Sequence, residues 1–211
     1  MNKLFSVYHF NDEPLPNELD ADLRAWLEQH LSEYDFVIAL DYGHGMLSAS
    51  TIDLLSRKSR FLAVNTQTNA ANTGFNPITK YPHADFICID EPEIRIAAGD
   101  RVNPVEVLLP QIAARVGARR AIVTRGHKGS LALDETGALH SICVLSSKVV
   151  DRVGAGDAFL SLAAPCAAAG LPMDLVGFIG NAAGALAVGI VGNRSSVEQT
   201  ALKKFLKTLM A

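Results

Sequence analysis

The chain has 211 residues, of which 49% are hydrophobic and 19% are charged, with 16 Gly and 9 Pro. These proportions are ordinary for a globular protein and exclude a mainly disordered chain. The 22 acidic and 19 basic residues give a net charge of -3, and the basic residues are scattered, so we expect no nucleic-acid partner. Lys203, Lys204 and Lys207 cluster near the C-terminus, where they predict a solvated helix face.

The cysteines and the apolar segments bear on the cellular location of the protein. Cys88, Cys143 and Cys166 lie in apolar surroundings without the spacing of a metal or redox motif, which predicts buried thiols and a cytoplasmic protein. The N-terminus becomes acidic before a signal-peptide core develops. The most apolar stretch, 176–192, is rich in Gly and Ala and contains Asn181, so it predicts a buried packing helix and no membrane span.

Short apolar segments alternate along the chain with segments of helical periodicity. The apolar segments, rich in β-branched residues like strands buried on both faces, are 35–41, 60–65, 84–90 and 120–126. The helical segments are 18–31, 48–58, 91–99 and 105–117. A hairpin is expected at 130–145 around Glu135-Thr136-Gly137, and helices from about Ala155 onward. This order predicts a single α/β domain over 1–211 with a mostly parallel central sheet.

Residues 64–81 interrupt the alternation with a polar segment rich in Asn and Thr. The segment leaves the carboxyl end of a predicted strand, where ligands of open α/β sheets bind. Two interpretations stay open, a functional loop and a solvated connector.

Gly154-Ala155-Gly156-Asp157 places three small residues and an acid at the predicted start of a helix. Free backbone N–H groups there, with no Cβ on the glycines to block approach, form a pocket for a phosphate group. A carboxylate beside that pocket can accept the proton of a hydroxyl group that attacks phosphorus. Alternatively, Asp157 is a first-turn acid that stabilises the helix start.

The context of this motif resembles a known family. VVDRVGAGDAF (149–159) is similar to the C-terminal signature of the ribokinase-like (PfkB) carbohydrate kinases. DYGHG (41–45), DEPE (90–93), VTRGHKG (123–129) and NAAGALAVGIVGN (181–193) occur in that family's order, and DYGHG most resembles the heptose-phosphate kinase domains. The resemblance implies a ribokinase-like three-layer sandwich. It also implies ATP- and magnesium-dependent phosphoryl transfer to a hydroxyl group of a sugar or sugar phosphate.

The resemblance assigns roles to individual residues. It implies that Asp157 is the catalytic base and that Gly154, Ala155 and Gly156 bind the transferred phosphoryl group. Further nucleotide-binding residues are Thr124, Arg125, Gly126, Gly129 and Asn181. The glycines are equally explained by turn geometry, Thr124 by a strand end, and Asn181 by a bond to a core backbone carbonyl.

Asp90 and Glu93 fall on the family's N-x-x-E element, with Asp90 where Asn is usual. In the family this Glu helps to organise the nucleotide phosphates and magnesium. The resemblance implies that Glu93 contacts magnesium through water. The same residues predict a helix capping box with Asp90 as N-cap and Glu93 at N3. Both interpretations can hold together.

Asp41 and His44 would face the substrate by the same resemblance, with His44 where Lys is common. Residues 43–48 also resemble a dinucleotide-binding fingerprint in which Ser48 replaces the third glycine. Asn65 stands where that fingerprint needs an acid, so a dinucleotide-binding domain is the weaker alternative.

The family's early sugar-binding segments have no counterpart in this sequence, and residues 3–10 resemble the strand that follows its lid. We therefore expect a C-terminal portion of the kinase fold that lacks the N-terminal strands and lid. Its expected partners are a second copy or other domains of a longer polypeptide. A second hypothesis is a non-catalytic domain that keeps the kinase fold for binding or assembly.

Overall fold

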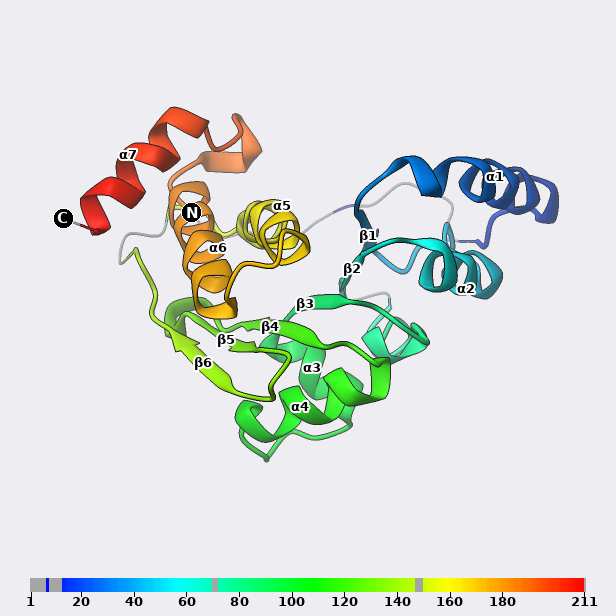
Figure 1. The fold of residues 1–211 in the computed structure, drawn as a ribbon, viewed down its shortest axis with the longest axis horizontal. Helices are drawn as coiled ribbons and strands as arrows, with labels where there is room; N and C mark the ends of the chain where they lie inside the picture. Colours follow the sequence, from blue (N-terminus) through cyan, green and yellow to red (C-terminus); the bar gives the residue numbers. More distant parts are fainter. Residues whose placement is uncertain (1–6, 8–12, 70–71, 147–149, 211) are drawn as a thin grey trace.

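The computed structural model describes residue 7 and residues 13–69, 72–146 and 150–210 (Figure 1). In this part of the chain, six strands form one sheet in the order β1-β2-β3-β4-β5-β6. The strands are β1 (Val37–Asp41), β2 (Leu62–Thr66), β3 (Phe86–Asp90), β4 (Arg120–Thr124), β5 (Ser130–Leu133) and β6 (Leu139–Ile142). Strands β1 to β4 are parallel, and β5 and β6 join antiparallel. The mostly parallel sheet is confirmed, whereas the strand expected at 3–10 lies, apart from Val7, outside the described residues.

Helices cover both faces of the sheet and make the expected three-layer α/β sandwich (Figure 1). The helices are α1 (Asn17–His30), α2 (Ala49–Lys58), α3 (Glu91–Ala98), α4 (Val105–Val116), α5 (Ala155–Ala168), α6 (Met173–Ala187) and α7 (Gln199–Leu209). Helices α2, α3 and α4 pack on one face around a large apolar cluster. Helices α5 and α6 pack on the other face around a second cluster.

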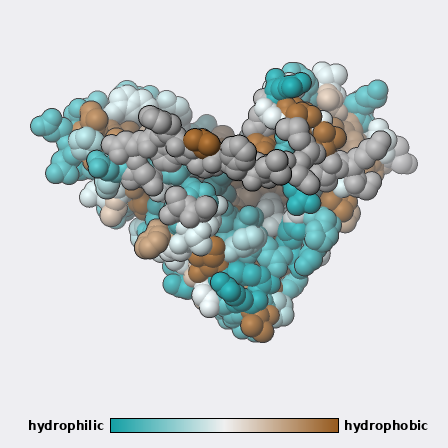
Figure 2. All heavy atoms as spheres, turned by 180° about the vertical axis from the view of Figure 1, so that it is seen from behind, coloured by the Kyte–Doolittle hydropathy of each residue, from teal (hydrophilic) through white to brown (hydrophobic). Residues whose placement is uncertain are grey.

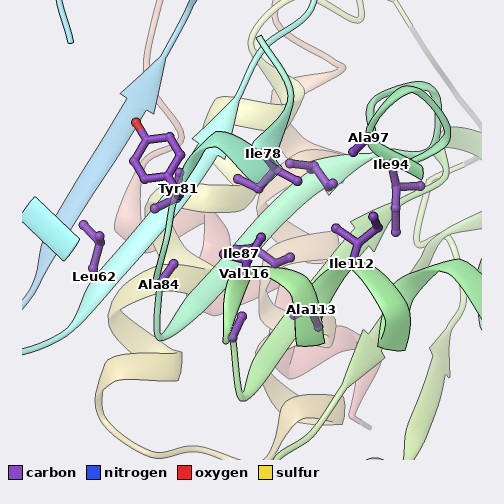
Figure 3. Close-up of a cluster of buried hydrophobic side chains, with 14 of the residues drawn as sticks. Leu62, Ile78, Tyr81, Ala84, Ile87, Ile94, Ala97, Ile112, Ala113 and Val116 are labelled. Carbon is purple, nitrogen blue, oxygen red and sulfur yellow. The ribbon is translucent and has the colours of Figure 1, made fainter. Parts of the chain in front are cut away.

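Strand β3 shows why the strand segments are almost continuously apolar. Phe86 and Cys88 belong to the cluster under α5 and α6, while Ile87 and Ile89 belong to the cluster on the α2–α4 side. Figure 3 shows Ile87 among side chains of α3, α4 and the loop before β3. Because alternate residues enter two different cores, no position of the strand is left for a polar side chain until Asp90 at its end.

The C-terminal half also follows the sequence. The Asp134 side chain accepts the N–H groups of Thr136 and Ala138 and closes the hairpin turn between β5 and β6. Helix α6 is the expected packing helix, although it ends at Ala187 rather than at residue 192. Among the described residues, no helix is both long enough and apolar enough to cross a membrane.

The surface differs from expectation at one cysteine. Cys88 is buried and Cys166 is half-buried, but Cys143 is exposed. Cys143 follows the last residue of β6, where the chain leaves the sheet, so the prediction of a buried thiol is wrong there. The lysines of α7 are exposed, as predicted. Figure 2 shows two lobes on either side of a hollow, with hydrophobic residues in scattered patches.

Candidate active site

The carboxyl ends of the parallel strands bring four polar residues to one edge of the sheet. These residues, the last of β1 to β4, are Asp41, Thr66, Asp90 and Thr124. The register pairs Asp41 with Thr66 and Asp90 with Thr124, so the paired strands end level. Ligands of open α/β sheets bind at this edge.

Helix α5 starts with an open N-terminus. Its N-cap, Gly154, has a φ of 78°, which glycine adopts without strain. No side chain caps the helix, and the N–H groups of Gly156 and Asp157 find no acceptor in the described part of the chain. A Cβ built on Gly156 would meet nothing within 4 Å. The start of α5 therefore offers free donors and open space to an anion.

Two consecutive residues after β2 contact two of the four acids that the sequence analysis singled out. The side-chain amide of Gln67 donates a hydrogen bond to Oδ1 of Asp157 at 3.1 Å. The backbone N–H of Thr68 donates to Oε1 of Glu93 at 3.0 Å. Asp157 and Glu93 are therefore neighbours across the segment 67–68. These two contacts favour the functional-loop interpretation of the polar segment after β2.

Asp157 lies near Tyr42 and at the edge of a groove. The aromatic ring of Tyr42 lies in its vicinity, and burial and the charge of Asp157 raise the pKa of Tyr42. Gly154 and Asp157 also line a groove of about 690 Å³ between α5, α6 and residues 190–202. The half-buried carboxylate can thus be reached by a small molecule.

Asp90 and Glu93 form the capping box that the sequence predicts. The N–H of Glu93 donates to Oδ1 of Asp90 at 2.8 Å, and the N–H of Asp90 donates to Oε2 of Glu93 at 2.8 Å. Burial and then the charge of Asp90 raise the pKa of Glu93 to about 7. Burial raises the pKa of Asp90 as well. A cation beside the pair would favour its fully ionised form.

The same two carboxylates fit a magnesium ion held through water. Magnesium in proteins usually keeps several waters and is bound by one or two carboxylates together with substrate phosphates. The carboxyl groups of Asp90 and Glu93 also interact directly with each other in the described part of the chain. In the same part of the chain, no group of three or more His, Cys, Asp or Glu side chains forms a direct cage.

The raised pKa of Glu93 predicts that stability falls as the pH rises. The unfolded chain releases this proton near the ordinary value of 4.5, whereas the folded chain holds it to about 7. Between these values the folded state binds more protons, so the free energy of unfolding decreases with pH. From about pH 5.5 to 7.5, urea titrations should show a loss of roughly 2 kcal/mol through this group.

Glu93→Gln should remove most of that pH dependence, because an amide does not titrate. Glu18→Gln, at an exposed position of α1, should keep it. Equal slopes for the wild type and Glu93→Gln would contradict the account of Glu93 as a buried acid.

Asp41 is held inside the protein. Its side chain is 5% exposed and forms an ion pair with Lys80 Nζ at 2.6 Å. The carboxylate also accepts hydrogen bonds from the Tyr81 hydroxyl at 2.8 Å and from the Gly43 N–H at 2.9 Å. Burial and the Asp41 charge raise the pKa of Tyr81, which keeps the phenol a donor. Asp41 thus ties β1 to the loop before β3. A direct contact of Asp41 with substrate stays a prediction.

Close packing accounts for the glycines of the DYGHG element. Gly43 and Gly45 have φ values of 70° and 80°. A Cβ on Gly43 would lie 2.6 Å from the Asn72 side chain, and one on Gly45 would lie 2.7 Å from the backbone before α1. These contacts give the dinucleotide alternative no support. His44 is half-buried in the same loop, with the Asn69 amide 3.5 Å from its Nε2.

Arg125 points its guanidinium group toward the helices of one layer. Nη1 lies 3.0 Å from Oε1 of Glu106 in α4, and Nε lies 3.6 Å from Oε2 of Glu91 in α3. Arg125 therefore fastens the turn after Thr124, which includes Gly126, to these helices. A nucleotide contact of Arg125 stays a prediction.

Gly129 and Asn181 lie where the turn after β4, the end of strand β6 and helix α6 meet. The Asn181 amide donates to the carbonyl of Cys143 at 2.9 Å, so the backbone-carbonyl alternative holds. Its side-chain oxygen has no partner among the described residues. A Cβ on Gly129 would overlap the carbonyl oxygen of Ile142. Both residues hold the end of β6 in place, and the oxygen of Asn181 stays available to a ligand.

Seven of the predicted residues form a continuous series across the sheet edge, joined by Gln67 and Thr68. It runs through Gly154, Ala155, Gly156, Asp157, Gln67, Thr68, Glu93, Asp90 and Thr124. Sequence reasoning missed Gln67, Thr68, Lys80 and Tyr81 as individual residues. The Asn- and Thr-rich composition of 64–81 was the signal for their segment, but it does not say which side chains meet the acids.

The sheet and its layers are those of the ribokinase-like α/β fold, which solved structures share. Phosphofructokinase-2 from Escherichia coli, in complex with potassium, matches with a TM-score of 0.76 at 15% identity, over 94% of this chain and 64% of that chain. Arabidopsis thaliana ribokinase, complexed with ribose and ATP, matches with a TM-score of 0.69 at 18% identity, over 92% and 60%. At these identities the likeness shows the fold alone.

Residues 58–200 match the model of the pfkB family carbohydrate kinases, and the chain belongs to that family. The bifunctional protein HldE of Trichlorobacter lovleyi is 26% identical over 183 residues, which cover 85% of this chain and 37% of that protein. The chain thus spans well under half the length of this relative and less than two thirds of the solved kinase chains.

Proposed function

We propose that the chain carries the ATP-binding and catalytic portion of a carbohydrate kinase. The observation that carries this proposal is the junction at Gln67 and Thr68. It brings Asp157, at the open start of α5, close to Glu93, in the first turn of α3. Membership of the pfkB family supports sugar phosphorylation as the general activity.

Asp157 acts as the general base in this proposal. The acceptor hydroxyl group gives its proton to Oδ2 of Asp157 while its oxygen forms a bond to the γ-phosphorus of ATP. The bond from that phosphorus to the bridging oxygen breaks, and ADP leaves with the electron pair. The N–H groups of Gly156 and Asp157 stabilise the charge on the transferred phosphoryl oxygens.

The nucleotide lies along segment 124–129 and Asn181, with its γ-phosphate at Gly154 to Gly156. The free side-chain oxygen of Asn181 can accept a hydrogen bond from an amino group of the base. Glu93 and Asp90 would hold magnesium through water, and the bound ion would supply positive charge that offsets the phosphate charge. Asp41 and His44 belong to the acceptor side.

The acceptor is a sugar or a sugar phosphate. The family description names carbohydrates, and the plant ribokinase was solved with ribose and ATP. Because the HldE relative is bifunctional and much longer, further domains are the partners we propose.

Binding of ATP with magnesium tests the proposed anion site. At about a hundred times its dissociation constant, a ligand adds roughly 2.7 kcal/mol, a shift of several degrees in the melting temperature. Gly156→Val should fold, since the site of the new side chain is open and glycine itself is a poor helix former. The variant should lose the shift, because the side chain fills the phosphate space.

Ala169→Val is the matched control, at the exposed opposite end of α5. It should keep the full ATP-induced shift. An equal shift in Gly156→Val would show that the phosphates bind elsewhere. No shift in the wild type would favour the non-catalytic hypothesis.

A further inference from the structure

We propose that Gln67 is a positioning residue that holds the catalytic carboxylate of Asp157 in its reactive orientation. The inference rests on the proposed function and assigns to that site a residue that the sequence analysis did not single out. Gln67 donates its side-chain amide to Oδ1 of Asp157 at 3.1 Å. It is the contact by which the β2 end touches the proposed base.

The backbone of Gln67 is fixed at both of its polar groups. Its N–H donates to the carbonyl of Asp41 at 2.8 Å. Its carbonyl accepts the side-chain amides of Asn72 at 3.1 Å and of Asn76 at 3.2 Å. Asn72 and Asn76 are both buried. The side-chain amide of Gln67 therefore extends toward Asp157 from a fixed stretch of backbone. This backbone cannot shift without breaking several buried hydrogen bonds.

The geometry divides the work between the two oxygens of Asp157. Oδ1 is held by Gln67, while Oδ2 has no partner among the described residues. A hydrogen bond to one oxygen limits rotation of the carboxylate and leaves the other free to accept a proton. Catalytic groups depend on such support, because a misplacement of about 1 Å can cost about a hundredfold in rate.

The side chain of Gln67 is not needed for the fold, since its backbone makes the bonds that hold the loop. Variants at this position should therefore fold and bind substrates normally. The opposite expectation would apply to Asn72 and Asn76, which are buried, so these residues are unsuitable for the test.

Steady-state kinetics of the full-length protein test the inference. Gln67→Leu should lower kcat by about tenfold or more, with KM for ATP and sugar changed by less than about twofold. Gln67→Glu should be at least as impaired, because it sets a carboxylate against Asp157. Gln67→Lys keeps a donor, although its charge stabilises the Asp157 carboxylate and weakens it as a base, and it should retain more of kcat than Gln67→Leu. A wild-type kcat in Gln67→Leu would overturn the inference, as would loss in Gln67→Lys equal to that in Gln67→Leu.

A second measurement needs no turnover. In Asp157→Ala, the side-chain NH₂ resonances of Gln67 should move toward those of a solvent-exposed Gln. They should stay in place in the control Asp174→Ala, which removes an acid from the first turn of α6. Unchanged resonances in Asp157→Ala would overturn the pairing itself. If Asp157→Asn keeps its activity, the proposed function fails; if only Gln67→Leu does, this inference alone fails.

Discussion

Replacing Asp157 with Asn is expected to lower kcat of the full-length protein by about a thousandfold, because a general base contributes roughly 10²- to 10⁴-fold. Asn has the same shape but cannot accept the proton of the acceptor hydroxyl group. ATP affinity should be unchanged or higher, since the variant removes a negative charge beside the proposed phosphate site. Steady-state kinetics and calorimetry of ATP binding measure the two effects separately.

The matched control is Asp174→Asn. Asp174 also lies in the first turn of a helix, α6, and is exposed. Both substitutions should cost about 0.3–1 kcal/mol of stability through the helix dipole. Only Asp157→Asn should lose turnover, and a kcat within a few fold of the wild type would show that another group takes the proton.

Gly129→Ala is expected to destabilise the protein by about 3 kcal/mol or more, from backbone strain and overpacking together. Gly129 has a φ of 81° and a ψ of -135°. A Cβ there would overlap the Ile142 carbonyl oxygen and approach the backbone of Cys143 and Val144 to 2.9 Å. Because every one of these neighbours is backbone, relief requires that the end of β6 move away. Urea unfolding measures the loss.

Gly126→Ala provides the comparison for Gly129→Ala. Gly126 has a φ of 56°, and a Cβ there would meet nothing within 4 Å. This variant should lose only about 1–2 kcal/mol, the cost of a left-handed residue. If Gly129→Ala were as stable as Gly126→Ala, the close approach of the turn to β6 would be wrong. Displacement of β6 should also weaken ATP binding, because Asn181 bonds to that strand end.

The elements of this protein could be predicted from sequence because their signals are local. Strand β3 is apolar at successive positions since both of its faces are buried, and its shortness and β-branched residues favour a strand over a buried helix. The capping box of Asp90 and Glu93 was predictable for the same reason, as all its atoms lie within four residues. The small residues at 154–156 indicated the open start of α5.

The partners of several side chains could not be predicted. Asp41 is buried against Lys80 and Tyr81, two partners that the sequence did not indicate. The Arg125 side chain pairs with Glu106, and the Asn181 amide with the carbonyl of Cys143. In each case the partner comes from another element of the fold. Composition and spacing carry no information about which of the available donors and acceptors meet.

The order of strands and helices, the polar edge of the sheet and the small-residue start of α5 with its acid were predictable from the residues alone. These features follow from hydrophobic periodicity and from hydrogen bonds between residues three or four apart. The contacts of Gln67 with Asp157 and of Thr68 with Glu93 depend instead on how distant parts of the chain pack together. That junction depends on the path of the loop after β2, which buried amides of Asn72 and Asn76 hold against β1. The path of a polar loop cannot be predicted from its sequence, because the loop has no repeating apolar pattern. Its contacts with distant residues are set by packing.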